Sequence, residues 1–429
     1  VPEAVAAIYK SLALAGITYD EGPDKDGGKG PYVQSQRLPI YKKYAELLIA
    51  SGNAYYCFCK KEEKAESEDT SERIEEQKRD PCRYLTPEQV AARFAEGITP
   101  VIRQRIPDEG STTFRDHVYG EITVENAQLD DQVLLKSDGF PTYNFANVID
   151  DHLMEITHVI RGQEYLSSTP KYNLLYQALG WQIPEYVHLP LILREDGAKL
   201  SKRAGDPSFE DLVQMGFLPE AIVNYVALLG WNPGDEREFF TMEELIEAFD
   251  IDRINKSSAA FSLDKLTWLN GEHIRRLEPL KFHQLALPYY PEGVRHLDLA
   301  KISRLIQIRI ERFTEIPDMV HFLYELPDYD GALFENPKSK STLQSSREIL
   351  QSVIPLLEGM TEWSNESLFA LLKEFATAQG YKIGTVMWPI RTALSGQFAS
   401  PGGATELADL LGKDETLRRL KIGLAKLQA

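Results

Sequence analysis

The stretch QVLLKSDGFPTYNFANVIDDHLMEITHVI, residues 132–160, decides the expected fold class of this chain. It opens with a short apolar run that is typical of a buried strand, passes through a helical pattern, and closes with a second apolar run at 156–160. A helix that opens with SSTPKY at 167–172 and a strand-like HLPLIL at 188–193 continue the alternation. Alternating strands and helices at this spacing predict a doubly wound, mostly parallel α/β sheet, which binds its ligands at the carboxyl ends of the strands.

The segments on either side of this stretch differ from it in kind. Apolar spacing predicts helices that begin after Pro2 and near Pro39, and β-like runs predict a small mixed unit between residues 50 and 132. Beyond Asp206 strands become rare. Amphipathic helices are predicted for PEAIVNYVALLGW, LIQIRIERF, ESLFALLKEFATAQG and the last segment, whose leucines are in register. We therefore expect an all-α carboxyl half that is too large for one small domain.

Length and charge narrow the class of protein. The chain has 429 residues and a formal net charge of -18 at pH 7, so we expect several domains and no general, sequence-independent binding to nucleic acid, although a local basic surface is compatible with this balance. No apolar run reaches membrane-spanning length and no signal peptide opens the chain. Three cysteines form a sparse, odd set that favours a reduced compartment. These features predict a soluble cytoplasmic protein.

A basic loop, GAKLSKRAGD at 197–206, stands out in this acidic chain. It follows the hairpin dipeptide Asp196-Gly197, so its cationic side chains come off a tight turn at the mouth of the predicted sheet. Lysine is a compact point charge that suits a phosphate oxygen whose charge grows during a reaction. The alternative is an exposed basic turn without a ligand, and the pentapeptide KLSKR alone favours that alternative.

The wider sequence resembles a known family and reverses this preference. KLSKR is similar to the second signature loop of class I aminoacyl-tRNA synthetases, and the chain resembles the bacterial glutamyl-tRNA synthetases in particular. The likeness covers essentially the whole chain. It is carried by GPYVQSQRLPIYKKYAELL, DQVLLKSDGFPTYNFANVIDDHLMEITHVIRGQEYLSSTPK, DKLTWLNGEHIRRL and KIGTVMWPIRTALSG.

The resemblance implies a Rossmann-like doubly wound catalytic domain with an inserted acceptor-binding domain, followed by all-α anticodon-binding domains. The implied divisions are 1–50 and 133–198 for the catalytic domain, 51–132 for the insertion, 199–278 for a stem-contact domain with the KLSKR loop, and 279–336 and 337–429 for two helical anticodon-binding subdomains. The implied partners are tRNA(Glu), L-glutamate and ATP with Mg²⁺, and we expect a monomer.

The resemblance also assigns roles to individual residues. Arg161 would face the side-chain carboxylate of glutamate, with Tyr143 and Asn147 as further contacts. A guanidinium fork suits a carboxylate better than a carboxamide, which favours glutamate over glutamine. The implied ATP contacts are Lys199, Ser201, Lys202 and Arg203, with the two lysines as catalytic residues. Arg309 and Arg312 would read the anticodon; their alternative is a solvated helix face.

The cysteines resemble the zinc-binding insertion of some bacterial members. Cys57, Cys59 and Cys82 supply three thiolates, and Tyr84 would be the fourth ligand. Zn²⁺ in structural sites prefers four ligands and soft sulfur donors, but tyrosine is an uncommon choice. The alternative is three reduced thiols in a small domain without a metal.

One family feature is missing from the given chain. The His-x-Gly-His element that forms the family's first ATP motif does not occur around any of the eight histidines. Our expectation is that residues preceding Val1 supply it, and that the chain as given has poor activity. Two alternatives remain: a glutamyl-queuosine tRNA(Asp) synthetase-like enzyme, which lacks an anticodon domain, and a catalytically inactive tRNA-binding module.

Overall fold

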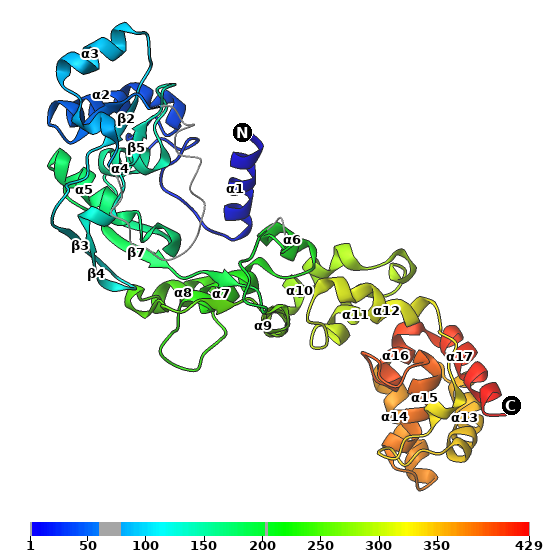
Figure 1. The fold of residues 1–429 in the computed structure, drawn as a ribbon. Coiled ribbons are helices and arrows are strands. Elements are labelled where there is room, and N and C mark those ends of the chain that lie inside the picture. Colours follow the sequence, from blue (N-terminus) through cyan, green and yellow to red (C-terminus); the bar gives the residue numbers. More distant parts are fainter. Residues whose placement is uncertain (1, 60–78, 202–204, 429) are drawn as a thin grey trace.

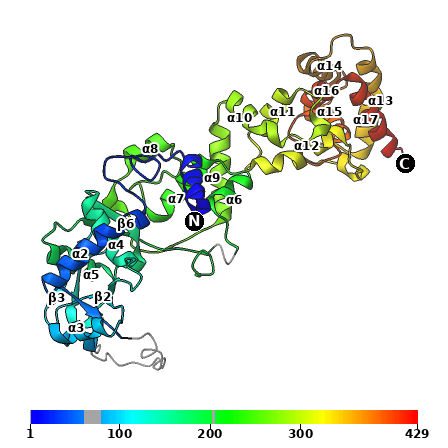
Figure 2. The ribbon, with the colours of Figure 1, turned by 90° about the horizontal axis from the view of Figure 1, so that it is seen from above.

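The computed structural model describes residues 2–59, 79–201 and 205–428 and shows an elongated molecule built from successive parts (Figures 1 and 2). An α/β part comes first, a mixed middle part follows, and a helical part forms the opposite end. None of the helices in the described ranges is both long and apolar enough to cross a membrane.

The elements follow the sequence in a simple order. The α/β part contains α1 (Pro2–Leu14), α2 (Leu38–Ala50), β1 (Ala54–Cys57), α3 (Pro87–Ala95), β2 (Val101–Gln104), β3 (Ser111–Asp116), β4 (Gly120–Glu125), β5 (Val133–Leu135), α4 (Tyr143–Leu153), β6 (His158–Gly162), α5 (Thr169–Leu179) and β7 (Glu185–Leu189). The middle part contains β8 (Ile192–Leu193), α6 (Phe209–Gln214), α7 (Pro219–Gly230), α8 (Met242–Ala248), β9 (Ala259–Ala260) and α9 (Leu263–Arg276). The helical part contains α10 (Pro279–Ala286), α11 (Leu299–Ile306), α12 (Ile316–Tyr324), α13 (Leu343–Glu358), α14 (Asn365–Ala378), α15 (Ile383–Ser395), α16 (Ala404–Leu411) and α17 (Lys413–Lys426).

The parallel pair that the sequence predicts is present. β6 and β7 are parallel neighbours in the sheet β4-β3-β7-β6, and α5 is the helix that connects them. Pro at the start of α5 costs no hydrogen bond, because the first amides of a helix have no partner within it. Strand β3 also runs parallel to β7, through the pair Asp116 and Tyr186.

One expected strand belongs to a different sheet. Residues 133–135 form β5, but β5 pairs antiparallel with β2 in the sheet β1-β2-β5 and not with β6. An apolar run reveals that a strand is buried, whereas its partner depends on contacts far away in sequence. The strand-like HLPLIL is also divided, into β7 and β8, at Pro190, which has no N–H for a ladder.

The helical part confirms most of the predicted helices and corrects one. The carboxyl-terminal leucines Leu417, Leu420 and Leu424 lie in α17, where Leu420 is fully buried, and Leu427 is the residue that caps the end of this helix. LIQIRIERF is not one helix, because α11 ends at Ile306. The side-chain amide of Gln307 instead donates to the carbonyl oxygens of Ile274 and Leu277, and the N–H of Phe313 donates to the carbonyl oxygen of Gly216. Contacts with the preceding part thus outweigh the local helical pattern.

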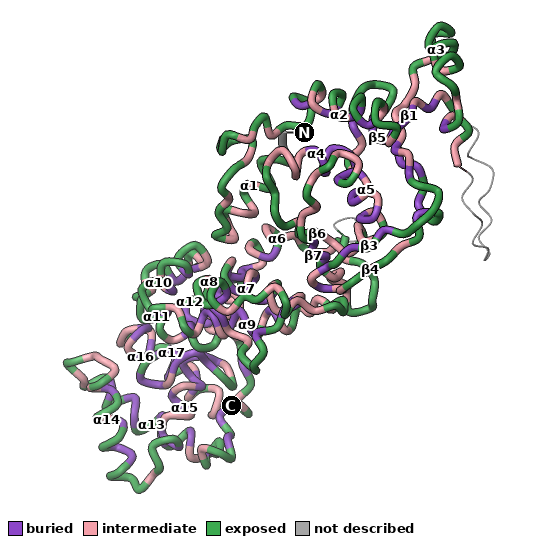
Figure 3. Tube along the Cα trace, turned by 90° about the vertical axis from the view of Figure 1, so that its left-hand side faces the viewer, coloured by how far each residue is buried: buried purple, intermediate pink, exposed green. Residues whose placement is uncertain are grey.

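Helix α1 forms as predicted but buries little of its apolar stripe. Its side chains Val5 and Ile8 are 42% and 59% exposed. The helix contacts α6, where the Ser11 hydroxyl donates to Glu210. Figure 3 shows the contrast with helices such as α5, in which buried residues are frequent.

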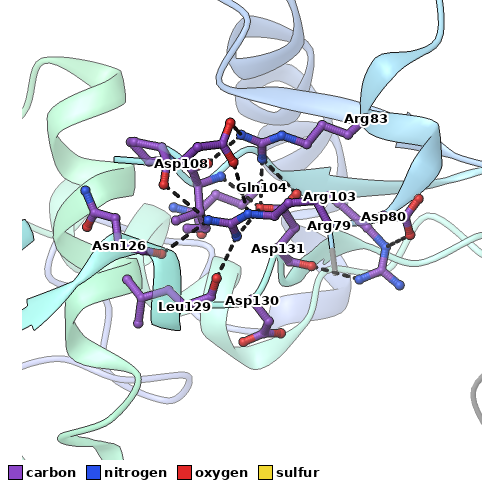
Figure 4. Close-up of polar contacts among 12 residues, drawn as sticks. Arg79, Asp80, Arg83, Arg103, Gln104, Asp108, Asn126, Leu129, Asp130 and Asp131 are labelled. Atoms are coloured by element: carbon purple, nitrogen blue, oxygen red, sulfur yellow. Dashed lines mark hydrogen bonds and ion pairs between the residues drawn. The ribbon is translucent and has the colours of Figure 1, made fainter. Parts of the chain in front are cut away.

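A buried ion-pair network stabilises the region between β1 and β5 (Figure 4). The guanidinium of Arg83 donates to both carboxylate oxygens of Asp131, at 3.0 and 2.9 Å, and Arg79 approaches the same carboxylate at 3.4 Å. The side chains of Arg83 and Asp131 are only 3% and 4% exposed. The Tyr55 hydroxyl and the Ile106 N–H donate to Asp131 as well. Asp131 therefore neutralises a buried cation and joins segments of this region that are distant in the sequence.

Replacing Asp131 by Asn should destabilise this region by about 3–5 kcal/mol, because the buried Arg83 would keep only the exposed carboxylate of Asp108 as a counter-charge. Since the chain has several cores, we expect local opening, which hydrogen exchange of the β1 and β2 amides measures directly. Asp108→Asn is the matched control: Asp108 also pairs with Arg83, but its side chain is 57% exposed, and its loss should cost less than about 1 kcal/mol. Equal protection in both variants would contradict this assignment.

Candidate functional site

Arg161 lies near the carboxyl end of β6, where ligands of parallel sheets bind. Its Nε donates to Nε2 of His188 at 3.3 Å, and its Nη2 donates to the hydroxyl of Thr169 at 3.2 Å. Within the described part of the chain, no carboxylate lies within ion-pair distance of this guanidinium. Arg161 is thus oriented by neutral acceptors and retains donors for an incoming anion.

Aromatic rings surround the Arg161 guanidinium. Its central carbon lies 5.1 Å from the ring centroid of Tyr165, 4.6 Å from Tyr172 and 5.6 Å from Tyr186. The negative ring faces stabilise a cation without removing its hydrogen-bonding capacity. Tyr165 is therefore in contact with Arg161.

Tyr143 and Asn147 come from the first turns of α4 and face the same cluster. The rings of Tyr143 and Tyr165 are 5.5 Å apart, and Tyr143 is 55% exposed. The side-chain oxygen of Asn147 is buried and has no hydrogen-bond partner among the described residues. A buried acceptor without a partner is costly, and a donor from a ligand would satisfy it. The three predicted side chains Tyr143, Asn147 and Arg161 are thus brought together.

Two residues that the sequence analysis did not identify, His188 and Asp116, hold Arg161 in place: His188 contacts Arg161, and Asp116 contacts His188. Nδ1 of His188 lies 2.6 Å from the carboxylate of Asp116, and both side chains are completely buried. Asp116 also accepts the backbone N–H groups of Val118, Tyr119 and His188. A proton on Nδ1 of His188, facing the carboxylate, leaves Nε2 as the acceptor for Arg161. The only signal in the sequence is a histidine inside an apolar strand, which is also typical of a core histidine.

Electrostatics agree with this arrangement. Burial raises the pKa of Asp116, but hydrogen bonds from His188 and from the Tyr119 and Val118 amides outweigh burial and hold the pKa below its ordinary value. Burial raises the pKa of Asp151, on α4, to about 6, and the charge of Arg161 partly opposes this effect. The cluster therefore keeps its fixed cation close to buried acidic groups without a direct ion pair.

The KLSKR loop begins with the predicted tight turn. Gly197 has a φ of +84°, and the N–H of Arg194 donates to the carbonyl oxygen of Ala198 at 2.7 Å. Lys199 pairs with Leu193 through an isolated bridge, and its side chain is exposed. The N–H of Ser201 donates to Asp206 at 2.7 Å. Lys202 and Arg203 lie outside the described residues.

The turn borders an open cleft of about 440 Å³. Acidic side chains from both ends of the loop and from the start of α9 line it together with apolar ones. The lining residues are Arg194, Glu195, Asp196, Leu200, Asp206, Pro207, Phe261, Leu263 and Asp264. The ion pair between Arg194 and Asp206, at 3.2 Å, closes the base of the loop. The described part of the loop thus stands beside a cavity.

The three predicted thiols lie together, and the carboxylate of Asp80 lies beside them. The sulfur atoms of Cys59 and Cys82 are 3.6 Å apart, and the Asp80 carboxylate lies 3.1 Å from Cys57 and 3.6 Å from Cys59. Sulfur ligands on one tetrahedral Zn²⁺ would be roughly 3.8 Å apart, so these residues fit the ion. Tyr84 is 66% exposed. Asp80 lies beside the thiols because it caps the short helix Pro81–Tyr84 by accepting the N–H of Cys82, and the ligand role of Tyr84 stays a prediction.

The two predicted anticodon arginines lie in different surroundings. Arg309 is exposed beside a cleft of about 550 Å³ between α12 and the segment around Ser400. Nε of Arg312 donates to Glu315 at 3.1 Å, and the guanidinium lies 5.9 Å from the ring centroid of Phe217 in the middle part. Arg309 is available to a ligand, whereas Arg312 already has partners at the junction between the two parts.

Comparisons with known proteins agree along the whole chain. The family model for "tRNA synthetases class I (E and Q), catalytic domain" matches residues 1–268, and the model for "Anticodon binding domain" matches residues 281–424. The chain is 52% identical to a glutamate–tRNA ligase of Clostridium botulinum and 49% identical to one of Clostridium acetobutylicum. Both alignments cover all of this chain and 89% of the relative.

Solved structures give the same result. A glutamate tRNA ligase from Elizabethkingia meningosepticum in complex with its amino acid aligns with a TM-score of 0.86 at 30% identity, over 100% of this chain and 90% of that one. The corresponding enzyme of Elizabethkingia anophelis aligns with a TM-score of 0.83. This chain therefore belongs to the class I tRNA synthetases of the glutamate and glutamine type, among the glutamate–tRNA ligases.

Proposed function

We propose that this protein joins L-glutamate to tRNA(Glu) at the expense of ATP. In the first step a carboxylate oxygen of glutamate attacks the α-phosphate of ATP, which gives glutamyl-adenylate and releases pyrophosphate. In the second step a terminal ribose hydroxyl of the tRNA, typically the 2'-hydroxyl in class I enzymes, attacks the acyl carbonyl and AMP leaves. The observation that carries this proposal is the oriented guanidinium of Arg161, in a chain that is 52% identical to a glutamate–tRNA ligase.

Arg161 would choose the amino acid. A guanidinium can donate two parallel hydrogen bonds to a carboxylate, and the bonds to His188 and Thr169 fix the plane in which it does so. A carboxamide would present an N–H₂ group to a donor-only side chain, so glutamine loses at least one bond. The unpartnered amide oxygen of Asn147 can accept a hydrogen bond from the ligand's ammonium group.

The KLSKR loop would serve the phosphates. Lys199 projects from the tight turn, and Lys202 follows three residues later in the sequence. Ammonium groups at this place can stabilise the charge that develops on the departing pyrophosphate, together with the Mg²⁺ that accompanies ATP. Ser201 and Arg203 complete the proposed ATP contacts.

The remaining parts would hold the tRNA. We assign residues 51–132 to the acceptor end, 199–278 to the stem and 279–429 to the anticodon, with Arg309 as an exposed contact. A structural Zn²⁺ held by Cys57, Cys59, Cys82 and Asp80 would stabilise the insertion. The match of residues 281–424 to an anticodon-binding family separates this protein from the shorter glutamyl-queuosine type, which has no such part.

Glutamate-dependent exchange between ATP and pyrophosphate tests the function. With the complete gene product we expect exchange that requires tRNA(Glu), as the resemblance implies, and glutamate attached to that tRNA. Lys202→Ala and Lys199→Ala should each slow exchange at least tenfold, which corresponds to about 1.4 kcal/mol in the transition state. Exchange that proceeds without tRNA, or at an unchanged rate in Lys202→Ala, would contradict the proposal. Binding of tRNA(Glu) without any exchange would favour the inactive binding module.

The role of His188 in orienting Arg161 can be separated from its role in stability. His188→Leu removes the acceptor for Arg161 and should raise KM for glutamate about tenfold, with little change in KM for ATP. His188→Gln can still donate to Asp116 and accept from Arg161, so it should retain most of the affinity. If His188→Leu fails to fold, Thr169→Val removes the other acceptor. Val187→Ala, at a fully buried position of the same strand, is the control, and its KM should not change.

The ligand set of the thiol cluster is also testable. Cys59→Ser should lose one equivalent of zinc relative to the unmodified protein, as measured by elemental analysis after dialysis. Asp80→Asn should weaken retention of the same equivalent, whereas Tyr84→Phe should leave it unchanged, because Tyr84 is mostly exposed. The opposite ranking of Asp80→Asn and Tyr84→Phe would restore tyrosine as the fourth ligand.

A further inference from the structure

A second group of possible metal ligands lies at the other end of the β6-β7 pair. His117 follows β3, His158 is the first residue of β6, and Glu185 is the first residue of β7. His158 and Glu185 are opposite each other in the parallel register, and the N–H of His117 donates to the carbonyl oxygen of Tyr186. Arg161 is three residues further along β6, roughly 10 Å away. This cluster is therefore separate from the glutamate site and plays no part in the proposed ligase reaction.

The side chains of the cluster converge on one point. Nε2 of His117 lies 2.6 Å from a carboxylate oxygen of Glu185, and Nε2 of His158 lies 3.5 Å from the same oxygen. All the candidate ligand atoms lie within 4.8 Å of one another. The side chains of His117, His158 and Glu185 are 28%, 46% and 58% exposed, so an ion could reach them from solvent.

The outer nitrogens of both imidazoles already have partners. Nδ1 of His117 faces the carboxylate of Asp252 at 3.4 Å, and Nδ1 of His158 lies 3.0 Å from the hydroxyl of Thr157. Both ring nitrogens of His117 therefore face carboxylates, which can only accept, whereas a neutral imidazole carries a single N–H. In either tautomer, one nitrogen of a neutral His117 presents its lone pair to a carboxylate: Nε2 to Glu185 when the proton is on Nδ1, or Nδ1 to Asp252 when the proton is on Nε2. Facing acceptors repel each other unless a cation lies between them.

We propose that His117, His158 and Glu185 bind a divalent transition-metal ion such as Zn²⁺. Two imidazoles and one carboxylate suit Zn²⁺, Ni²⁺ or Cu²⁺, whereas Mg²⁺ and Ca²⁺ prefer oxygen ligands. Nitrogen and oxygen ligands on one tetrahedral Zn²⁺ are roughly 3.3 Å apart. The 3.5 Å between His158 and Glu185 fits this spacing, whereas the 2.6 Å between His117 and Glu185 is a hydrogen-bond distance that must lengthen when the ion binds. Three protein ligands leave one position for water.

Asp252 extends the site across a boundary between parts. It belongs to the short helix Ile251–Arg253 of the middle part, whereas the three ligands belong to the α/β part. A carboxylate that accepts the outer N–H of a metal-bound imidazole fixes the ring and increases its basicity. Next to it, the Tyr119 hydroxyl donates to the carbonyl oxygen of Lys256 at 3.3 Å. Metal binding would thus reinforce the contact between the sheet and the middle part.

A proton is the alternative cation. The hydrogen bond to Glu185 raises the pKa of His117, so a protonated imidazole could satisfy the same carboxylates as an ordinary ion pair. A bound metal ion and a proton on His117 differ in whether they need His158. A proton on His117 needs no third ligand, whereas a metal ion loses one of its three protein ligands when His158 is removed.

Titration with Zn²⁺ against a chromophoric chelator at pH 7.5 distinguishes them. The full chain should bind one more equivalent of Zn²⁺ than His158→Ala, or bind it at least tenfold more tightly, and Glu185→Gln should resemble His158→Ala. The thiol cluster is present in all these proteins, so its own occupancy cancels in the comparison. His296→Ala, at an exposed histidine away from the cluster, is the matched control and should bind as the unmodified chain does.

Asp252→Asn provides a second measurement, because it leaves all three ligands in place. We expect Zn²⁺ affinity at the additional site to fall about tenfold or more, as is typical when the partner of a metal-bound imidazole is lost. Zn²⁺ should also raise the melting temperature of the unmodified chain more than that of His158→Ala. Equal stoichiometry, equal affinity and equal thermal shifts in the unmodified chain and His158→Ala would show that the cluster holds only a proton, and would overturn the proposal.

Discussion

The structure of the site depends on how a permanent cation is held at the end of a strand. Arg161 cannot lose its charge, and direct pairing with a protein carboxylate would occupy the donors that a ligand needs. The chain places the compensating carboxylate of Asp116 one side chain further away, behind His188. The three tyrosine rings and the more distant Asp151 add stabilisation that does not block the guanidinium. The result is a fixed, oriented cation that still gains free energy by binding a carboxylate.

The junction between the middle part and the helical part matters as much as the Arg161 site. Because the molecule is elongated, this junction sets the distance between the site and the proposed tRNA-binding surface of the helical part. Gly216 has a φ of +90°, and a Cβ at this position would lie 2.7 Å from the backbone nitrogen of Thr314. Asn270 accepts the N–H of Leu218 and donates to the carbonyl oxygen of Glu311. These contacts join the middle part to the helical part through backbone groups, which leaves little freedom for a hinge there. Arg312, paired with Glu315 beside Phe217, belongs to the same junction.

The sequence pattern correctly predicts the elements whose formation depends on interactions between neighbouring residues. The β6-α5-β7 unit, α14 and α17 follow from periodicity and capping, and all three are present. The partner of β5 and the end of α11 at Ile306 depend on contacts between distant segments, and there the prediction was wrong. Arg161, Tyr143 and Asn147 came from resemblance to a family. His188 and Asp80 could not be found in this way, because a buried histidine in a strand and an aspartate at a helix start have ordinary structural roles as well.

Two neighbouring arginines, Arg309 and Arg391, form a local basic spot in this acidic chain, although the carboxylates of Glu315 and Asp318 also line the adjacent cleft. Burial and the nearby charge of Arg309 both lower the pKa of Arg391, so two guanidinium groups repel each other beside the cleft at Ser400. Arg391 also lies 4.5 Å from the ring centroid of Trp388, and Phe398 is 64% exposed. An RNA phosphate or an unstacked base would relieve the repulsion and cover the aromatic surface. If the tRNA binds here as proposed, the two arginines and the exposed aromatic surface would favour this place over the acidic remainder of the surface.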